Sequence, residues 1–124
     1  MLKTFLMLGS LNALLAVLLG AFGAHGLKQQ LSPQMLTIYH TAVEYHTWHA
    51  LGLILIGLLG AHLSASAWLA WAGGFMLTGI LLFSGSLYVL SVTGARWLGA
   101  ITPFGGTAFI ISWALLALAV WRNG

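Results

Sequence analysis

Residues 4–24 read TFLMLGSLNALLAVLLGAFGA and decide the class of fold. This stretch contains no charged residue. A bilayer core of about 30 Å takes roughly 20 helical residues per crossing, so the stretch is long enough for one transmembrane helix. A secretory signal peptide has similar features. Because the chain starts at Met1, we expect the segment to be retained as a helix.

The rest of the chain has the same apolar character. Of its 124 residues 60% are hydrophobic and only 4% are charged, which leaves too little polar surface for a soluble domain. We predict an all-α integral membrane protein, a bundle of four transmembrane helices with short loops. The chain forms a single domain, residues 1–124, with helices at about 4–24, 33–63, 67–92 and 102–121.

The scarcity of charged and reactive side chains excludes several functions. The cations Lys3, Lys28, Arg96 and Arg122 are scattered, so we expect no nucleic acid partner. Without cysteine, the chain has no disulfide, thiolate nucleophile or Fe–S ligand. Asp is absent too, and no phosphate loop is present, so we predict that the protein is not an enzyme, has no cofactor and has no identifiable small-molecule substrate.

Small residues mark one face of the first predicted helix. They are Gly9, Ala13, Ala16, Gly20 and Ala24, spaced so that they share one side, and we expect this side to pack closely on another helix. Asn12 lies beside the stripe, and its amide needs a hydrogen-bond partner in hydrocarbon.

Two cap-and-proline patterns predict helix starts. Ser32 followed by Pro33 is typical of an N-cap with proline in the first turn, and Thr102 followed by Pro103 repeats it. Four crossings put both termini on one side of the membrane. Each side then has two cations, so charge alone does not orient the protein.

Glu44 is the single acidic side chain. An ionised carboxylate at membrane depth is costly unless it is paired or hydrated. His40 precedes it by one helical turn and could bond it, but we expect the partner to be Arg96. A binding site for a metal or haem, or a proton relay, using His25, Glu44 and His49 is an alternative, although one carboxylate and no cysteine are few ligands.

Four segments carry a resemblance to a known family. They are Gly20 to His25, Glu44 and Tyr45 with His49, Phe83 to Tyr88, and Thr102 to Gly106. With them the chain resembles the domain-of-unknown-function 423 family, YgdD-like small bacterial inner-membrane proteins. The resemblance implies a four-helix protein of the bacterial cell inner membrane with cytoplasmic termini, and it implies no activity.

Helix order places the polar candidates on the side opposite the termini. We expect a polar cluster there, with these members: His25, Glu44, Tyr45, His49, Ser84, Ser86, Tyr88, Arg96 and Thr102. The leading hypothesis is a non-enzymatic binding or assembly protein whose cluster engages membrane lipids, a small ligand or a partner protein. A homo-oligomer, or an accessory subunit of a larger membrane complex, is the third interpretation.

Overall fold

The structure is a computed structural model that describes residues 2–63 and 67–123, and every regular element in these ranges is a helix or a helical turn. The elements are α1 (Leu2–Phe22), the π turn η1 (Gly23–Leu27), α2 (Pro33–His62), α3 (Ala67–Gly79), the π turn η2 (Ile80–Ser84), α4 (Gly85–Thr93), the 3₁₀ turn η3 (Arg96–Ala100) and α5 (Thr102–Asn123). These elements form four continuous helical rods. The first is α1 with η1, the second is α2, the third is α3 with η2 and α4, and the fourth is η3 with α5.

All four rods are long and apolar enough to cross a bilayer. They span Lys3–Leu27, Pro33–His62, Ala67–Thr93 and Arg96–Arg122, and the shortest has 25 residues against the roughly 20 that one crossing needs. The predicted fold class, an all-α membrane protein with four transmembrane helices, is confirmed.

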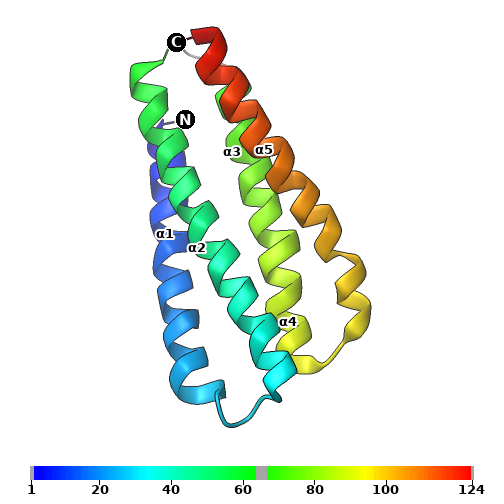
Figure 1. The fold of residues 1–124 in the computed structure, drawn as a ribbon. Coiled ribbons are helices and arrows are strands. Elements are labelled where there is room, and N and C mark those ends of the chain that lie inside the picture. Colours follow the sequence, from blue (N-terminus) through cyan, green and yellow to red (C-terminus); the bar gives the residue numbers. More distant parts are fainter. Residues whose placement is uncertain (1, 64–66, 124) are drawn as a thin grey trace.

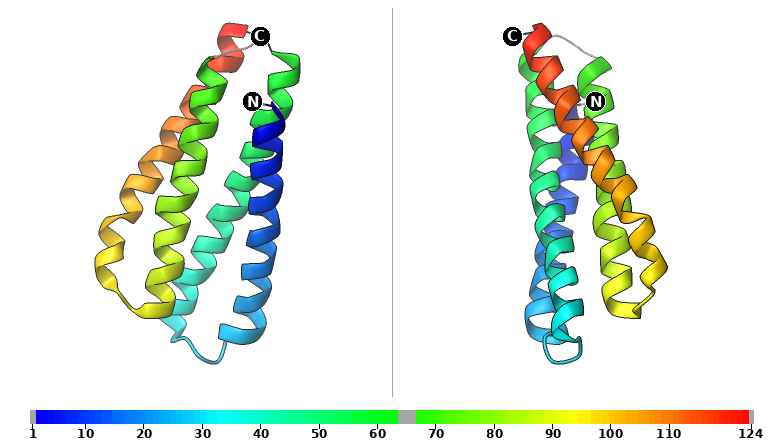
Figure 2. Two further views of the ribbon diagram at one scale, coloured as in Figure 1. Left: turned by 180° about the vertical axis from the view of Figure 1, so that it is seen from behind. Right: turned by 45° about the vertical axis from the view of Figure 1, so that its right-hand side comes forward.

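Successive rods run in opposite directions, so both ends of the chain lie at the same end of the bundle (Figure 1). The helix α1 packs on α2, α5 packs on α3, and α2 contacts α3, η2 and α4 in the middle (Figure 2). The apolar core lies between α2, α3 and α5, where Leu53, Met76 and Phe109 are almost fully buried.

Two glycines let one helix lie directly against the backbone of another. A Cβ on Gly9 would lie 2.8 Å from the backbone nitrogen of Ile54, and a Cβ on Gly105 would lie 2.2 Å from the backbone nitrogen of Phe83. Both obstacles are backbone atoms, which cannot rotate away as a side chain can. These contacts are the small-residue packing that joins membrane helices.

The stripe of small residues on α1 packs on another helix as predicted, except at its end, and that helix is α2. Gly9 and Ala16 are buried, but Ala24 is exposed and Gly23 lies against the ring of Tyr39 instead. The physical reason is the π turn η1, which holds an extra residue and so rotates the following side chains around the helix axis.

Both predicted helix starts match the structure, since α2 begins at Pro33 and α5 at Thr102, but only the cap at Ser32 is formed. The Ser32 hydroxyl accepts a hydrogen bond from the Met35 backbone N–H at 3.2 Å, with Pro33 in the first turn. Thr102 does not start a free helix end, because η3 leads into α5 and the Phe104 N–H donates to the carbonyl of Ile101. The Thr102 hydroxyl instead contacts Ser86 at 2.6 Å.

Candidate functional site

A chain of hydrogen bonds through His46 joins three helices. The Asn12 amide nitrogen on α1 donates to the carbonyl of Leu8 at 2.8 Å, so its oxygen is free to accept. That oxygen lies 2.9 Å from Nε2 of His46 on α2, and Nδ1 of His46 lies 2.9 Å from the Tyr88 hydroxyl on α4. The predicted need of Asn12 for a partner is confirmed.

The partners of His46 define its protonation pattern. Since the Asn12 oxygen can only accept, Nε2 of His46 carries the proton and donates it, and in the neutral ring Nδ1 accepts from the Tyr88 hydroxyl. His46 is 2% exposed. The chain of bonds ends at an amide, which does not pass protons on, so this arrangement supports the bundle and makes a poor proton relay.

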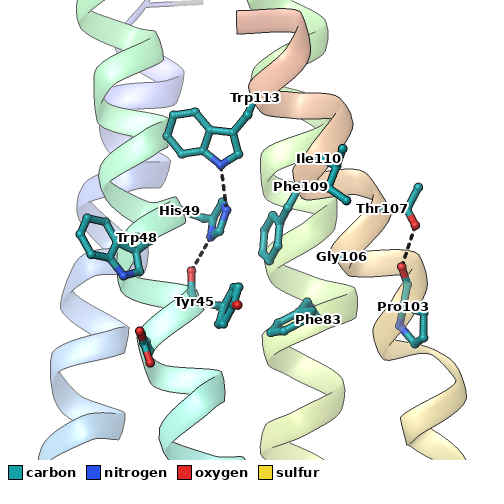
Figure 3. Close-up of a pocket in the computed structure, with 11 residues that line it drawn as sticks. Tyr45, Trp48, His49, Phe83, Pro103, Gly106, Thr107, Phe109, Ile110 and Trp113 are labelled. Carbon is teal, nitrogen blue, oxygen red and sulfur yellow. Dashed lines mark hydrogen bonds between the residues drawn. The ribbon is translucent and has the colours of Figure 1, made fainter. Parts of the chain in front are cut away.

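A groove of about 690 Å³ lies between α2 and α5, where the two helices separate (Figure 3). Its walls carry mostly aromatic and apolar side chains, namely Glu44, Tyr45, Trp48, His49, Phe83, Pro103, Gly106, Thr107, Phe109, Ile110 and Trp113. Small-molecule sites in proteins commonly have volumes of about 300 to 1,000 Å³ and a mainly apolar lining with a few polar groups. The groove has both features.

The aromatic rings form a continuous wall. Tyr45 and Phe83 have ring centroids 4.5 Å apart, and Phe83 and Phe109 are 5.5 Å apart. His49 stacks on Phe109 at 3.5 Å with an angle of 10° between the planes (Figure 3). Helices α2 and α5 and the turn η2 therefore each contribute a ring to this surface.

His49 is held in one tautomer by its two partners. The Trp113 indole N–H donates to Nε2 of His49 at 3.0 Å, and Nδ1 of His49 donates to the carbonyl of Tyr45 at 2.6 Å. An indole can only donate and a carbonyl can only accept, so the ring is neutral with its proton on Nδ1. His46 and His49 thus have opposite tautomers although only two residues lie between them.

Glu44 lines the groove and is exposed. Among the described residues it has no hydrogen bond or ion pair, and the Tyr45 hydroxyl beside it has none either. The expected pair with Arg96 is therefore wrong, and so is the bond with His40. Glu44 lies well inside α2, whereas Arg96 lies on η3 at the end of the bundle that holds the α4–α5 connection.

The depth of Glu44 follows from the length of α2. With 30 residues the helix is about 45 Å long, so at most about 15 Å can protrude at one end when a core of about 30 Å is crossed. Glu44 lies about 16 Å from Pro33 along the axis. The backbone of Glu44 is therefore at or below the hydrocarbon surface, and its carboxylate lies near that surface.

Serine hydroxyls join further helix pairs. Ser84 donates to the carbonyl of Ala42 at 2.8 Å, and Ser112 donates to the carbonyl of Ala72 at 2.6 Å. Ser86 contacts Thr102 and donates to the carbonyl of Phe83 at 3.0 Å. These hydroxyls act within the bundle and do not reach the groove.

The predicted polar cluster is divided among several places. Glu44, Tyr45 and His49 lie in the groove, Tyr88 lies in the His46 chain, and Ser84, Ser86 and Thr102 lie at helix contacts. His25 and Arg96 are exposed near the ends of their helices.

The metal alternative needed His25, Glu44 and His49 together. Within residues 2–63 and 67–123 no three histidine or acidic side chains lie close enough to hold a metal ion. Both ring nitrogens of His49 already have partners, so ligation would break at least one bond.

Sequence reasoning missed Trp48, Phe83, Phe109 and Trp113 as groove residues. Trp113 could have been found by its position. Tryptophan is enriched at membrane interfaces, and Trp113 stands ten residues inside the end of α5, where its N–H needs an acceptor. Trp48 is likewise interior to α2.

Four apolar crossings and a groove between them define a multi-pass membrane protein, and the comparisons give its family. The family model "Protein of unknown function (DUF423)" matches residues 19–106, and the chain belongs to this family. The UPF0382 membrane protein YwdK of Bacillus subtilis (strain 168) is 55% identical over 117 residues, which are 94% of this chain and 95% of that protein.

A UPF0382 membrane protein of Staphylococcus epidermidis (strain ATCC 12228) is 49% identical over 120 residues, 97% of each chain. Another, from Staphylococcus saprophyticus, is 44% identical over 120 residues, 97% of this chain and 98% of that protein. No solved structure matches the chain.

Proposed function

We propose that the protein is a non-enzymatic membrane binding protein that holds a small hydrophobic ligand from the bilayer in the groove between α2 and α5. One observation carries the proposal, a cavity of about 690 Å³ with a wall of aromatic rings and two polar groups that have no partner among the described residues, the Glu44 carboxylate and the Tyr45 hydroxyl. Reactive groups for catalysis are not needed for this role.

The shape of the molecule favours a ligand that enters from the lipid. The groove is bordered by membrane-spanning segments, and the side chains of Trp48, Ile110 and Trp113 that line it are 61%, 71% and 40% exposed. A hydrophobic molecule dissolved in the bilayer can reach these side chains without crossing water. Moving an apolar ligand from lipid into the groove gains little free energy, because both surroundings are apolar. Ring stacking and shape would therefore have to supply the selectivity.

Photolabelling tests the proposal. We would incorporate the full chain in lipid nanodiscs, label it with a neutral aryl diazirine and locate the adducts by mass spectrometry. Adducts should concentrate on Trp48, Phe83 and Trp113, and excess unlabelled aryl competitor should reduce them. Uniform labelling of these residues and of the exposed α1 residues Leu14 and Val17 would overturn the proposal.

A pair of glycine variants provides the control. Gly106 lines the groove, and a Cβ there would come no closer than 3.7 Å to Phe83, so Gly106→Leu should fill the groove and suppress the concentrated labelling. Gly74 on α3 has nothing within 4 Å of its Cβ position, and Gly74→Leu should leave the labelling unchanged. Ile110→Trp is a second way to fill the groove if Gly106→Leu does not fold.

We also propose that the membrane is the bacterial cytoplasmic (inner) membrane and that both termini face the cytoplasm. The support is the resemblance to inner-membrane proteins, since the cations at the two ends are equal in number. The chain has no cysteine, so single-cysteine variants report accessibility cleanly.

An impermeant maleimide on intact cells tests this orientation. Gln29→Cys, in the α1–α2 connection, should react in intact cells, and His62→Cys, at the other end of α2, should react only after the membrane is permeabilised. The opposite pattern would reverse the orientation.

A further inference from the structure

Resting on the proposed function, we infer the class of ligand: the groove binds a small hydrophobic organic cation, whose charge contacts the Glu44 carboxylate and whose apolar groups lie on the rings of Trp48, Tyr45 and Trp113. The inference joins three observations on the described residues, which are the charge of the lining, the placement of the rings and the depth of the carboxylate.

The charge of the groove has one sign. Glu44 is the one residue among those lining the groove that carries a formal charge at neutral pH, and His49 there is neutral because of its two partners. No lysine or arginine lines the groove, so a carboxylate or phosphate ligand would find no cation to bind. A phospholipid is disfavoured for the same reason, because its phosphate would lie near Glu44.

The rings are placed to help bind a positive charge. Glu44 and Trp48 are four residues apart on α2, so their side chains lie on one face about one turn from each other. The face of an indole attracts a cation more strongly than the other aromatic rings do, and the effect grows when water is absent. Tyr45, 40% exposed, adds a second ring and a hydroxyl that has no partner in residues 2–63 and 67–123.

The depth of Glu44 supplies the reason for a charged ligand. An ionised carboxylate near the hydrocarbon surface is unfavourable without a partner, and the protein provides none among its described residues. A hydrophobic cation offsets this charge while its remaining atoms stay in apolar surroundings. A neutral ligand would leave the carboxylate unpaired or protonated.

Tetraphenylphosphonium is the probe for a direct test, and tetraphenylborate is its matched anion with the same four rings. The full chain in nanodiscs would be equilibrated with radiolabelled probe, with empty nanodiscs as the background. We expect saturable binding of tetraphenylphosphonium, no saturable binding of tetraphenylborate, at least a tenfold weaker affinity in Glu44→Gln and a several-fold weaker affinity in Trp48→Leu. Trp71→Leu is the matched control, since Trp71 on α3 is 63% exposed and does not line the groove, and it should bind as the wild type does.

The outcomes separate the two levels of the proposal. Concentrated diazirine labelling without tetraphenylphosphonium binding, or with equal affinity in wild type and Glu44→Gln, would overturn the cation inference and leave the proposed function standing. Uniform labelling together with no binding of either ion would overturn both. Crosslinks between copies at Trp48, with no probe bound, would show that a second copy covers the groove and would also overturn the inference.

Discussion

The two sides of α2 are built differently. On one side α2 packs on α1 with backbone in contact with backbone at Gly9, and His46 has both ring nitrogens bonded to side chains of other helices. On the other side α2 and α5 are separated by the groove, and the His49 ring bridges them through Trp113 and Phe109.

The difference shows that similar residues serve different purposes on the two sides. On the packed side no buried polar side chain of the described residues lacks a hydrogen-bond partner, as the Asn12, His46 and Tyr88 chain illustrates. On the groove side Glu44 is left without a protein partner among the described residues. Unpaired ionisable groups at membrane depth are rare, and they commonly mark functional sites.

The largest expected effect separates two adjacent glycines on α5. Gly105 faces the backbone of η2, where an added Cβ would lie 2.2 Å from the backbone nitrogen of Phe83, so Gly105→Ala should force α5 away from η2. We expect a loss of stability of about 3 kcal/mol, at the upper end of typical overpacking costs. Thermal unfolding of the detergent-solubilised protein would measure it.

Gly106→Ala is the matched control for this prediction. Its Cβ would meet the Phe83 ring at 3.7 Å, which is an ordinary contact at the groove. Its stability should stay within about 0.5 kcal/mol of the wild type or rise slightly, because alanine restricts the unfolded chain. Equal losses in both variants would contradict the distinction between the close α5–η2 contact at Gly105 and the open groove at Gly106.

A smaller effect is expected from the same substitution at the two histidines. His46→Phe removes a donor and an acceptor and leaves the Asn12 oxygen and the Tyr88 hydroxyl without their partner, at a cost of about 2 kcal/mol. His49→Phe keeps a flat ring on Phe109 and leaves only the Trp113 N–H unpaired, at a cost of about 1 kcal/mol or less. Denaturation in mixed detergent micelles would compare the two.

His46→Asn sharpens the test. Asparagine is shorter and cannot reach both partners across α1 and α4, so it should not restore the stability of the wild type. If His49→Phe proved the more harmful change, the groove side would be the one that holds the bundle together, and the comparison would be reversed.

The sequence predicts the helices because length and composition determine them in a bilayer. It also predicts which residues of α1 share the side that packs on another helix, since a spacing of three and four residues defines one side of a helix. The prediction fails at Ala24, because the π turn η1 adds a residue to the turn, and no residue type in that segment marks such a turn in advance.

The groove could be predicted only in part. Glu44, Tyr45 and His49 were found because they lie near one another on a single helix. Their partners Phe83, Phe109 and Trp113 lie on other elements, and contact between helices depends on how each is rotated and how deep it lies. The same dependence explains the wrong pair of Glu44 with Arg96, since helix order gave the correct end of the bundle but not the depth.

The smallest expected effect comes from the serine that joins α2 to η2. Ser84→Ala removes a hydrogen bond of 2.8 Å to the Ala42 carbonyl, but that carbonyl belongs to the interior of α2 and keeps its partner in the helix. Interhelical bonds of this kind contribute about 0.6 kcal/mol in membrane proteins, so we expect a loss of that order. Ser112→Ala, which removes the equivalent bond to Ala72, should match it. A loss above about 2 kcal/mol for either serine would show that these hydroxyls, more than the glycine contacts, hold the helices together.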